Sequence, residues 1–164
     1  MKNSNKITIE LMTAATDEVR PLIGELEAIL SAGYTPEQRH GLPLDKIFQP
    51  HIRFFVARFD GEAVGCGGVA LFDDFAEVKR MYVREAARGR GVADALMEQL
   101  EKEAGAAGLH ALRLETGDVL VAATKFYTRA GFSMCDAYGE YAAMEPHRIV
   151  RSIFMEKRLL EKAA

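Results

Sequence analysis

The residues most able to do chemistry lie in a basic turn within residues 78–96, between a strand-like stretch and an amphipathic helix. In this turn Gly89 and Gly91 alternate with Arg88 and Arg90. Glycine lets a ligand approach the backbone closely, and the first amides of a helix have no partners inside the helix and carry partial positive charge. The turn therefore predicts an anion site, most naturally for a pyrophosphate.

The charge around this turn supports a polyphosphate ligand. The chain as a whole has a formal net charge of −3. Within residues 79–90, however, a single acid, Glu85, accompanies five cations: Lys79, Arg80, Arg84, Arg88 and Arg90. We expect a polyphosphate cofactor to lie in this cluster, because a local excess of positive charge attracts anions whatever the overall charge.

Two common phosphate-binding patterns do not account for the turn. The P-loop pattern requires Lys-Ser or Lys-Thr after its last glycine, and neither follows Gly91. The dinucleotide pattern G-x-G-x-x-G also fails, because Asp94 stands where its third glycine belongs. On the glycines and arginines alone, a basic turn that only caps a helix explains the segment equally well.

The composition excludes several classes of protein. With 164 residues, 49% of them hydrophobic, the chain can bury the core of a single domain over residues 1–164. Its negative charge argues against non-specific nucleic-acid binding, and no apolar run approaches the roughly 20 residues that cross a bilayer. No signal-peptide pattern is present, so we expect a cytoplasmic protein. Two cysteines and four histidines lack metal-ligand spacing, so we expect no metal.

Hydrophobic periodicity predicts strands and helices on both sides of this turn. The expected strands are 7–12, 53–59, 63–71, 75–83, 111–116, 132–135 and 149–155, and the expected helices are 19–33, 91–108 and 119–130. Asp60-Gly61 predicts a hairpin turn, and Pro21 predicts an irregular first turn in the first helix. Residues 34–50, with at most a short helix at 45–49, are expected to wall a binding site. This order predicts an α/β (α+β) fold, a mixed and mostly antiparallel sheet with helices on both faces.

Two motifs carry a resemblance to a known family. Residues 88–93 match R-x-x-G-x-[GA] after a strand that reads Lys-Arg-Met-Tyr-Val, and residues 123–132 read Ala-x-x-Phe-Tyr-x-x-x-Gly-Phe. At this spacing the chain resembles the GNAT superfamily of acyl-CoA-dependent N-acetyltransferases over most of its length. The N-terminal segment and the tail from Tyr138 match less well.

The resemblance implies a fold and a cosubstrate. In the family a β-bulge splays the fourth strand from the fifth, so that a V-shaped cleft opens between this central strand pair and holds acetyl-CoA. Here the pantetheine arm is expected to bond to the backbone of Met81, Tyr82 and Val83, where an amide would polarise the thioester carbonyl. The pyrophosphate is expected on the backbone of Arg88, Gly89, Arg90, Gly91, Val92, Ala93 and Asp94.

The resemblance also implies catalytic side chains. Tyr127 matches the tyrosine that many members use as general acid toward the leaving thiolate, and Glu77 is the candidate general base. Glu115, at the end of the next strand, is a rival base, and bulk solvent is a third option. Ordinary structural roles stay open for both residues: Tyr127 could be an aromatic residue that packs in the core, and Glu77 a glutamate at a strand edge that faces water. Leu120 replaces a frequent asparagine of the family, which removes one polar contact to the cofactor arm.

The implied function is direct transfer of an acetyl group from acetyl-CoA to an amine of a small molecule or peptide. The acceptor-side candidates are Tyr34, Glu115, Tyr138, Tyr141 and Arg148. The alternative is a protein of the same fold that binds acyl-CoA as a sensor or scaffold without turnover. No nucleic-acid or membrane partner is expected, and the oligomeric state stays open, although homodimers are common among relatives.

Overall fold

The computed structural model describes residues 6–160, and a seven-stranded sheet in the order β1-β2-β3-β4-β5-β7-β6 forms its centre. The strands are β1 Ile7–Met12, β2 Ile52–Phe59, β3 Glu62–Leu71, β4 Ala76–Val83, β5 Ala111–Gly117, β6 Ser133–Met134 and β7 Ser152–Arg158. The α-helices are α1 Val19–Gly33, α2 Val92–Ala106, α3 Val121–Arg129 and α4 Pro146–Ile149. Short 3₁₀ helices lie at Pro36–Gln38, Leu44–Lys46, Glu85–Ala87 and Gly139–Ala143.

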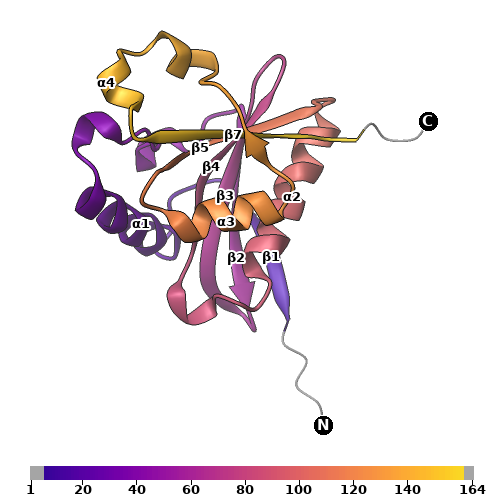
Figure 1. Cartoon of the computed structure of the whole chain (residues 1–164). Helices are drawn as coiled ribbons and strands as arrows, with labels where there is room; N and C mark the ends of the chain where they lie inside the picture. The colour runs from indigo at the N-terminus through magenta and orange to yellow at the C-terminus, as the bar shows by residue number, and fades with distance from the viewer. Residues whose placement is uncertain (1–5, 161–164) are drawn as a thin grey trace.

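The sheet divides at the junction of β4 and β5. All neighbouring strands pair antiparallel except these two, which are parallel and in register only at Ala76 with Leu112 and at Glu77 with Arg113. Beyond Glu77 the two strands separate, and in Figure 1 β5 and β7 run across the view while β2 and β3 run down it. The expected mixed, mostly antiparallel sheet with a splayed central pair is confirmed.

A β-bulge in β4 accompanies this separation. Cys66 of β3 lies opposite Tyr82 and Gly68 lies opposite Lys79, so that two residues of β4, Arg80 and Met81, share the single partner position at residue 67. Arg80 has a φ of 55°, a left-handed conformation that residues other than glycine adopt rarely. A bulge bends its strand and shifts the alternation of side chains by one residue. It therefore turns the end of β4 away from β5.

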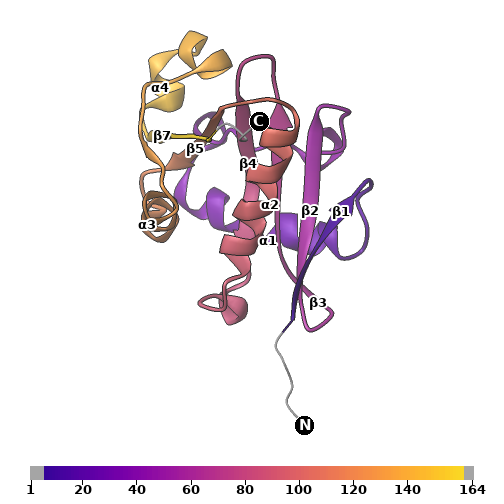
Figure 2. The same ribbon diagram turned by 90° about the vertical axis from the view of Figure 1, so that its right-hand side faces the viewer.

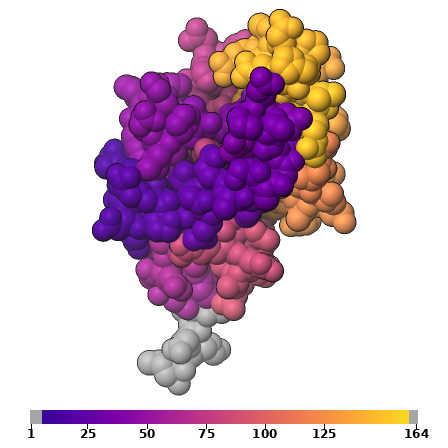
Figure 3. Space-filling view, turned by 90° about the vertical axis from the view of Figure 1, so that its left-hand side faces the viewer, coloured from indigo at the N-terminus to yellow at the C-terminus, as the bar shows by residue number. Residues whose placement is uncertain are grey.

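Helices cover both faces of the sheet. On one face α2 and α3 pack on a core that includes Leu96, Leu100 and Leu112. On the other face α1 packs through Leu22 and Ile23. Figure 2 shows α2 in front of the sheet and α1 behind it, and Figure 3 shows the α1 face, over which the indigo and violet atoms of the N-terminal third spread. Within residues 6–160, no helix is both long and apolar enough to cross a membrane.

Most predicted elements occur, and the exceptions are short or late in the chain. Asp60 and Gly61 form the hairpin turn with φ of 50° and 88°. Pro21 does not disturb α1, because it falls in the first turn, where an amide needs no partner inside the helix. The last strand begins at Ser152 instead of residue 149, because 146–149 form α4. A helix of this length carries no detectable periodicity and depends on tertiary contacts.

Two glycine variants should separate close packing from helix propensity. A Cβ at Gly65 would lie 2.8 Å from the backbone oxygen of Tyr82, beside the bulge, whereas one at Gly24 in α1 meets no atom within 4 Å. We expect Gly65→Ala to lower the free energy of unfolding by about 1–3 kcal/mol, because the strands must shift. We expect Gly24→Ala to raise it by about 0.5–1 kcal/mol. Urea unfolding measures both, and a neutral Gly65→Ala would show that β3 and β4 tolerate separation.

Candidate active site

A groove of about 670 Å³ runs along β4 and the starts of α2 and α3. Its walls include the apolar residues Leu120, Val121 and Phe126 of the α3 segment. They also include every residue predicted to hold the cofactor except Arg90: Met81, Tyr82, Val83, Arg88, Gly89, Gly91, Val92, Ala93 and Asp94. These residues form one continuous wall of the groove.

The start of α2 and the turn before it line the groove. Gly89 and Gly91 have φ of 79° and 85°, so the turn before the helix uses the left-handed conformation that favours glycine. No side chain caps the helix at Gly91. The first amides of α2 therefore keep their donors for a ligand, and the helix dipole adds positive potential. The Arg88 Nε donates to the Val83 carbonyl at 3.1 Å, which fixes its guanidinium at the groove.

The cationic cluster of residues 79–90 does not assemble at this anion site, which corrects the expectation from sequence. Of its five cations, only Arg88 lines the groove. Lys79 pairs with Glu77 at 3.1 Å, Arg80 with Glu27, and Arg84 with Glu25 at 2.9 Å, while Arg90 lies over the ring of Phe59 at 5.0 Å. Three of the five therefore form ion pairs away from the groove, two of them with acids of α1. A cation not singled out from sequence, Arg129 of α3, lines the groove instead.

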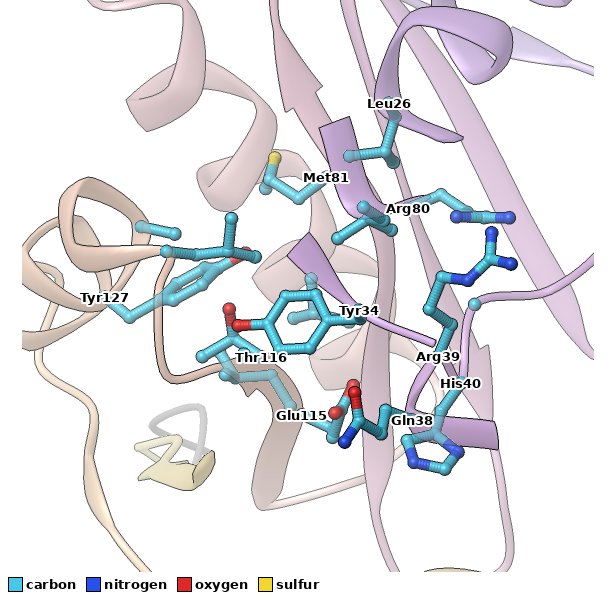
Figure 4. A pocket seen from close by; sticks show the side chains of 17 residues that line it. Leu26, Tyr34, Gln38, Arg39, His40, Arg80, Met81, Glu115, Thr116 and Tyr127 are labelled. Atoms are coloured by element: carbon cyan, nitrogen blue, oxygen red, sulfur yellow. The ribbon is translucent and has the colours of Figure 1, made fainter. Parts of the chain in front are cut away.

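A second, smaller cavity of about 120 Å³ opens where β4 and β5 part. Figure 4 shows it from close by, walled by α1, the segment after α1, both strands and α3. Met81 and Tyr127 line this cavity and the groove alike. The two spaces therefore meet at the β4 bulge and the α3 tyrosine.

Tyr127 stands at this junction with a free hydroxyl. Its ring packs edge-on against Phe126 at 5.4 Å and Phe132 at 5.8 Å, and the residue is 7% exposed. Its hydroxyl has no hydrogen-bond partner among residues 6–160. Burial, with a smaller effect of the Glu115 charge, raises the pKa of Tyr127. The hydroxyl therefore stays protonated at neutral pH and can donate to a ligand.

Glu115 lies in the second cavity with its ionised form disfavoured. The Ser152 Oγ donates to its carboxylate at 2.6 Å. Burial raises the pKa of Glu115, and it outweighs the opposing effects of the Ser152 hydrogen bond, His40 and Lys79. A carboxylate with a raised pKa that lines a cavity is a candidate proton acceptor.

Glu77 lies outside both spaces, together with two of the predicted acceptor contacts. It is 4% exposed and lines a separate cavity of about 610 Å³ with Tyr138 and Tyr141. Its Oε2 accepts from the Tyr138 hydroxyl at 2.9 Å and the Tyr141 hydroxyl at 2.7 Å, and its Oε1 lies 3.1 Å from the Lys79 Nζ. Both oxygens are engaged, which argues against Glu77 as the direct base and against the two tyrosines as acceptor contacts.

The other acceptor-side candidates have distinct roles. Tyr34 lines the second cavity, but its hydroxyl donates to Asp118 Oδ1 at 3.0 Å and accepts from the Val119 amide at 2.8 Å, so it ties the end of α1 to the loop after β5. Arg148 contributes only its carbonyl oxygen, 2.7 Å from His40 Nε2. The sequence did not single out the polar side chains after α1 that line the cavity, Gln38, Arg39 and His40, although it predicted that this segment walls a site.

Residues 23–132 match the Acetyltransferase (GNAT) family. The chain belongs to this family. It is 41% identical over 155 residues to the IAA acetyltransferase of Azospirillum brasilense, which covers 93% of this chain and 98% of that protein. Such a relative, together with the family match, identifies this GNAT chain as an acyltransferase.

Two solved structures resemble the fold of this GNAT chain. A structure from Klebsiella pneumoniae subsp. pneumoniae is 33% identical, with a TM-score of 0.74 over 94% of this chain and 98% of that one. A GNAT family acetyltransferase from Elizabethkingia anophelis with acetyl-CoA bound is 19% identical, with a TM-score of 0.67 over 93% and 98%. The second shows likeness of fold alone.

The raised pKa of Glu115 predicts how the stability of a variant changes with pH. Because the folded protein disfavours the ionised form, this carboxyl lowers stability as the pH rises through its folded pKa. We expect Glu115→Gln to be more stable than the parent near neutral pH, with the gain vanishing below the ordinary carboxyl pKa of about 4.3. Thermal unfolding across pH measures this effect. Glu98→Gln, at an exposed site of α2, is the control, and a gain independent of pH would contradict the assignment.

Proposed function

We propose that this protein, acting as one domain over residues 1–164, transfers an acetyl group from acetyl-CoA directly to the amine of a small molecule. The observation that carries the proposal is that the groove and the smaller cavity meet at Tyr127 and Met81. A cosubstrate in the groove and an acceptor in the cavity would then be in contact. The small size of the cavity favours a small molecule over a peptide.

The groove suits coenzyme A at both ends. At one end the amides of the Gly89–Gly91 turn and the start of α2, with Arg88 and Arg129 beside them, would hold the pyrophosphate. At the other end β4 no longer pairs with β5, so its backbone groups from Met81 to Val83 face a ligand instead of a strand. When bound, acetyl-CoA supplies an activated acetyl thioester. A main-chain amide at the bulge would stabilise negative charge on the carbonyl oxygen.

Two side chains manage the protons of the transfer. An ammonium has no lone pair for attack, so the acceptor must lose a proton, and Glu115 is the carboxylate that lines its cavity. On the opposite side the Tyr127 hydroxyl would donate its proton to the sulfur that leaves. Both groups act from fixed positions, because Ser152 holds Glu115 and two aromatic rings hold Tyr127.

Thiol release from acetyl-CoA across a panel of amines tests the transfer and the acid. We expect Tyr127→Phe to lower kcat about 100-fold, because the departing sulfur loses its donor, while the KM for acetyl-CoA stays unchanged. Tyr138→Phe is the matched control and should retain kcat, because Tyr138 lines neither the groove nor the second cavity. An unchanged kcat in Tyr127→Phe would refute the acid role. Acetyl-CoA binding without thiol release for any amine would instead indicate an acyl-CoA sensor.

The pH dependence of kcat/KM tests the base. We expect activity to rise with pH through a pKa above the ordinary carboxyl value, since Glu115 must be ionised to accept a proton and its pKa is raised. In Glu115→Gln kcat/KM should fall about 100-fold or more and this ascending limb should disappear. Amines of different basicity serve as the control. If the pKa of the ascending limb changes with the amine, or if the limb persists in Glu115→Gln, the ionising group is the acceptor amine and not Glu115.

A further inference from the structure

The cavity wall remote from Tyr127 carries two arginines that the proposed reaction does not use. Figure 4 shows Arg39 and Arg80 on one side of the cavity and Tyr127 on the other, with Tyr34 between them. We propose that the acceptor is a small amino carboxylate, such as an amino acid, whose carboxylate binds the guanidinium groups of Arg39 and Arg80. This inference rests on the proposed function, since it names the substrate class of the same site.

Arg80 is a buried cation with one donor unpaired. Its side chain is 3% exposed. The Nε donates to the Leu42 carbonyl at 2.8 Å and the Nη2 donates to Glu27, but the Nη1 is buried without a partner. Burial lowers the pKa of the guanidinium to about 10, the direction expected when a charge lacks full compensation. Buried donors are normally satisfied, so an unpartnered one in a residue that lines a cavity points to a ligand acceptor.

Arg39 supplies a second open donor on the same wall. Its Nη1 lies 3.5 Å from Glu27 Oε2, while its Nε is buried and unpaired. Both arginines therefore share the single acid Glu27, which leaves an excess of one positive charge. A Cβ at Gly41 would overlap the Arg80 guanidinium, so any side chain there would displace this group.

The rest of the cavity complements the other parts of an amino carboxylate. Glu115 is the carboxylate of the cavity wall, and it would face the ammonium group. The carbon skeleton would contact an apolar lining made of Leu26, Leu30, Val78 and Leu114. A hydrogen bond from a guanidinium to a carboxylate is charge-assisted and stronger than a neutral one, and an amine that lacks a carboxylate cannot form it. The site thus places the Glu115 carboxylate near the amino group of the acceptor and two arginines near its carboxylate.

Matched pairs of acceptors test the carboxylate directly. Phenylalanine is compared with phenethylamine, and alanine with ethylamine, in thiol release from acetyl-CoA. We expect kcat/KM to favour the amino acid about 10- to 100-fold, the range of a hydrogen bond to a charged group. Equal or better turnover of the decarboxylated amine would overturn the substrate class while leaving acetyl transfer intact.

Variants of Arg39 test the assigned side chains. Arg39→Gln should lower kcat/KM for the amino acid about 10-fold or more and leave that for the decarboxylated amine unchanged, and Arg39→Lys should recover part of the loss. Arg20→Gln, the same charge change at an exposed residue of α1, is the control and should match the parent. Arg80→Lys provides a second test on the other cation. An equal loss for both acceptors in Arg39→Gln would show a structural role.

If no amine is acetylated, the proposed reaction is refuted. A binding experiment then still tests the carboxylate site. Calorimetry of the protein loaded with coenzyme A measures the affinity for N-acetylphenylalanine and for its primary amide, which lacks the charge. We expect the acid to bind about 10-fold more tightly, with the difference lost in Arg39→Gln. Equal affinities would overturn the carboxylate site independently of catalysis.

Discussion

The parting of β4 from β5 is the constraint on which the rest of the site depends. Two parallel strands that stayed paired would use their facing amides and carbonyls in the ladder and would leave no space between them. Here the ladder ends after Glu77, and a bulge at Arg80 and Met81 bends β4 away. The same geometric change frees backbone groups of β4 for one ligand and opens the floor of a cavity for another. The groove and the smaller cavity thus share one structural cause.

A divided sheet must be held together by other contacts, and α1 with the segment after it makes them. On the β4 side, Glu25 pairs with Arg84 and Glu27 with Arg80. On the β5 side, Tyr34 is bonded to Asp118 and Val119, so a single covering segment spans the gap. Removing charges from water costs free energy, so such pairs contribute more to positioning than to stability. They determine where the wall of the cavity stands.

The parts of the site that could be predicted are those that the local backbone requires. The turn from Arg88 to Gly91 adopts its left-handed glycine conformation before α2 because a strand end, two glycines and a helix start are sufficient to build it. The cations beside it could not be placed in the same way, since Arg84 and Arg80 pair with acids of α1 more than fifty residues away in the sequence. The sequence likewise favoured Glu77 as the base and made Glu115 only its rival, although of the two only Glu115 lines the cavity.

The sequence by itself determined most of the element order, the mixed sheet, the family and the glycine-containing turn before α2, because periodicity, turn residues and contiguous motifs are local properties. Only the tertiary structure decided which charged side chain serves which space. Beyond the bulge, a one-residue shift of register with β3 decides to which face of the sheet each β4 side chain points. The helix that covers that face then decides which residue the side chain pairs with, as α1 does for Arg80. Both are long-range facts. They separated Glu115 from Glu77 and placed Arg80 in the wall of the smaller cavity instead of the groove.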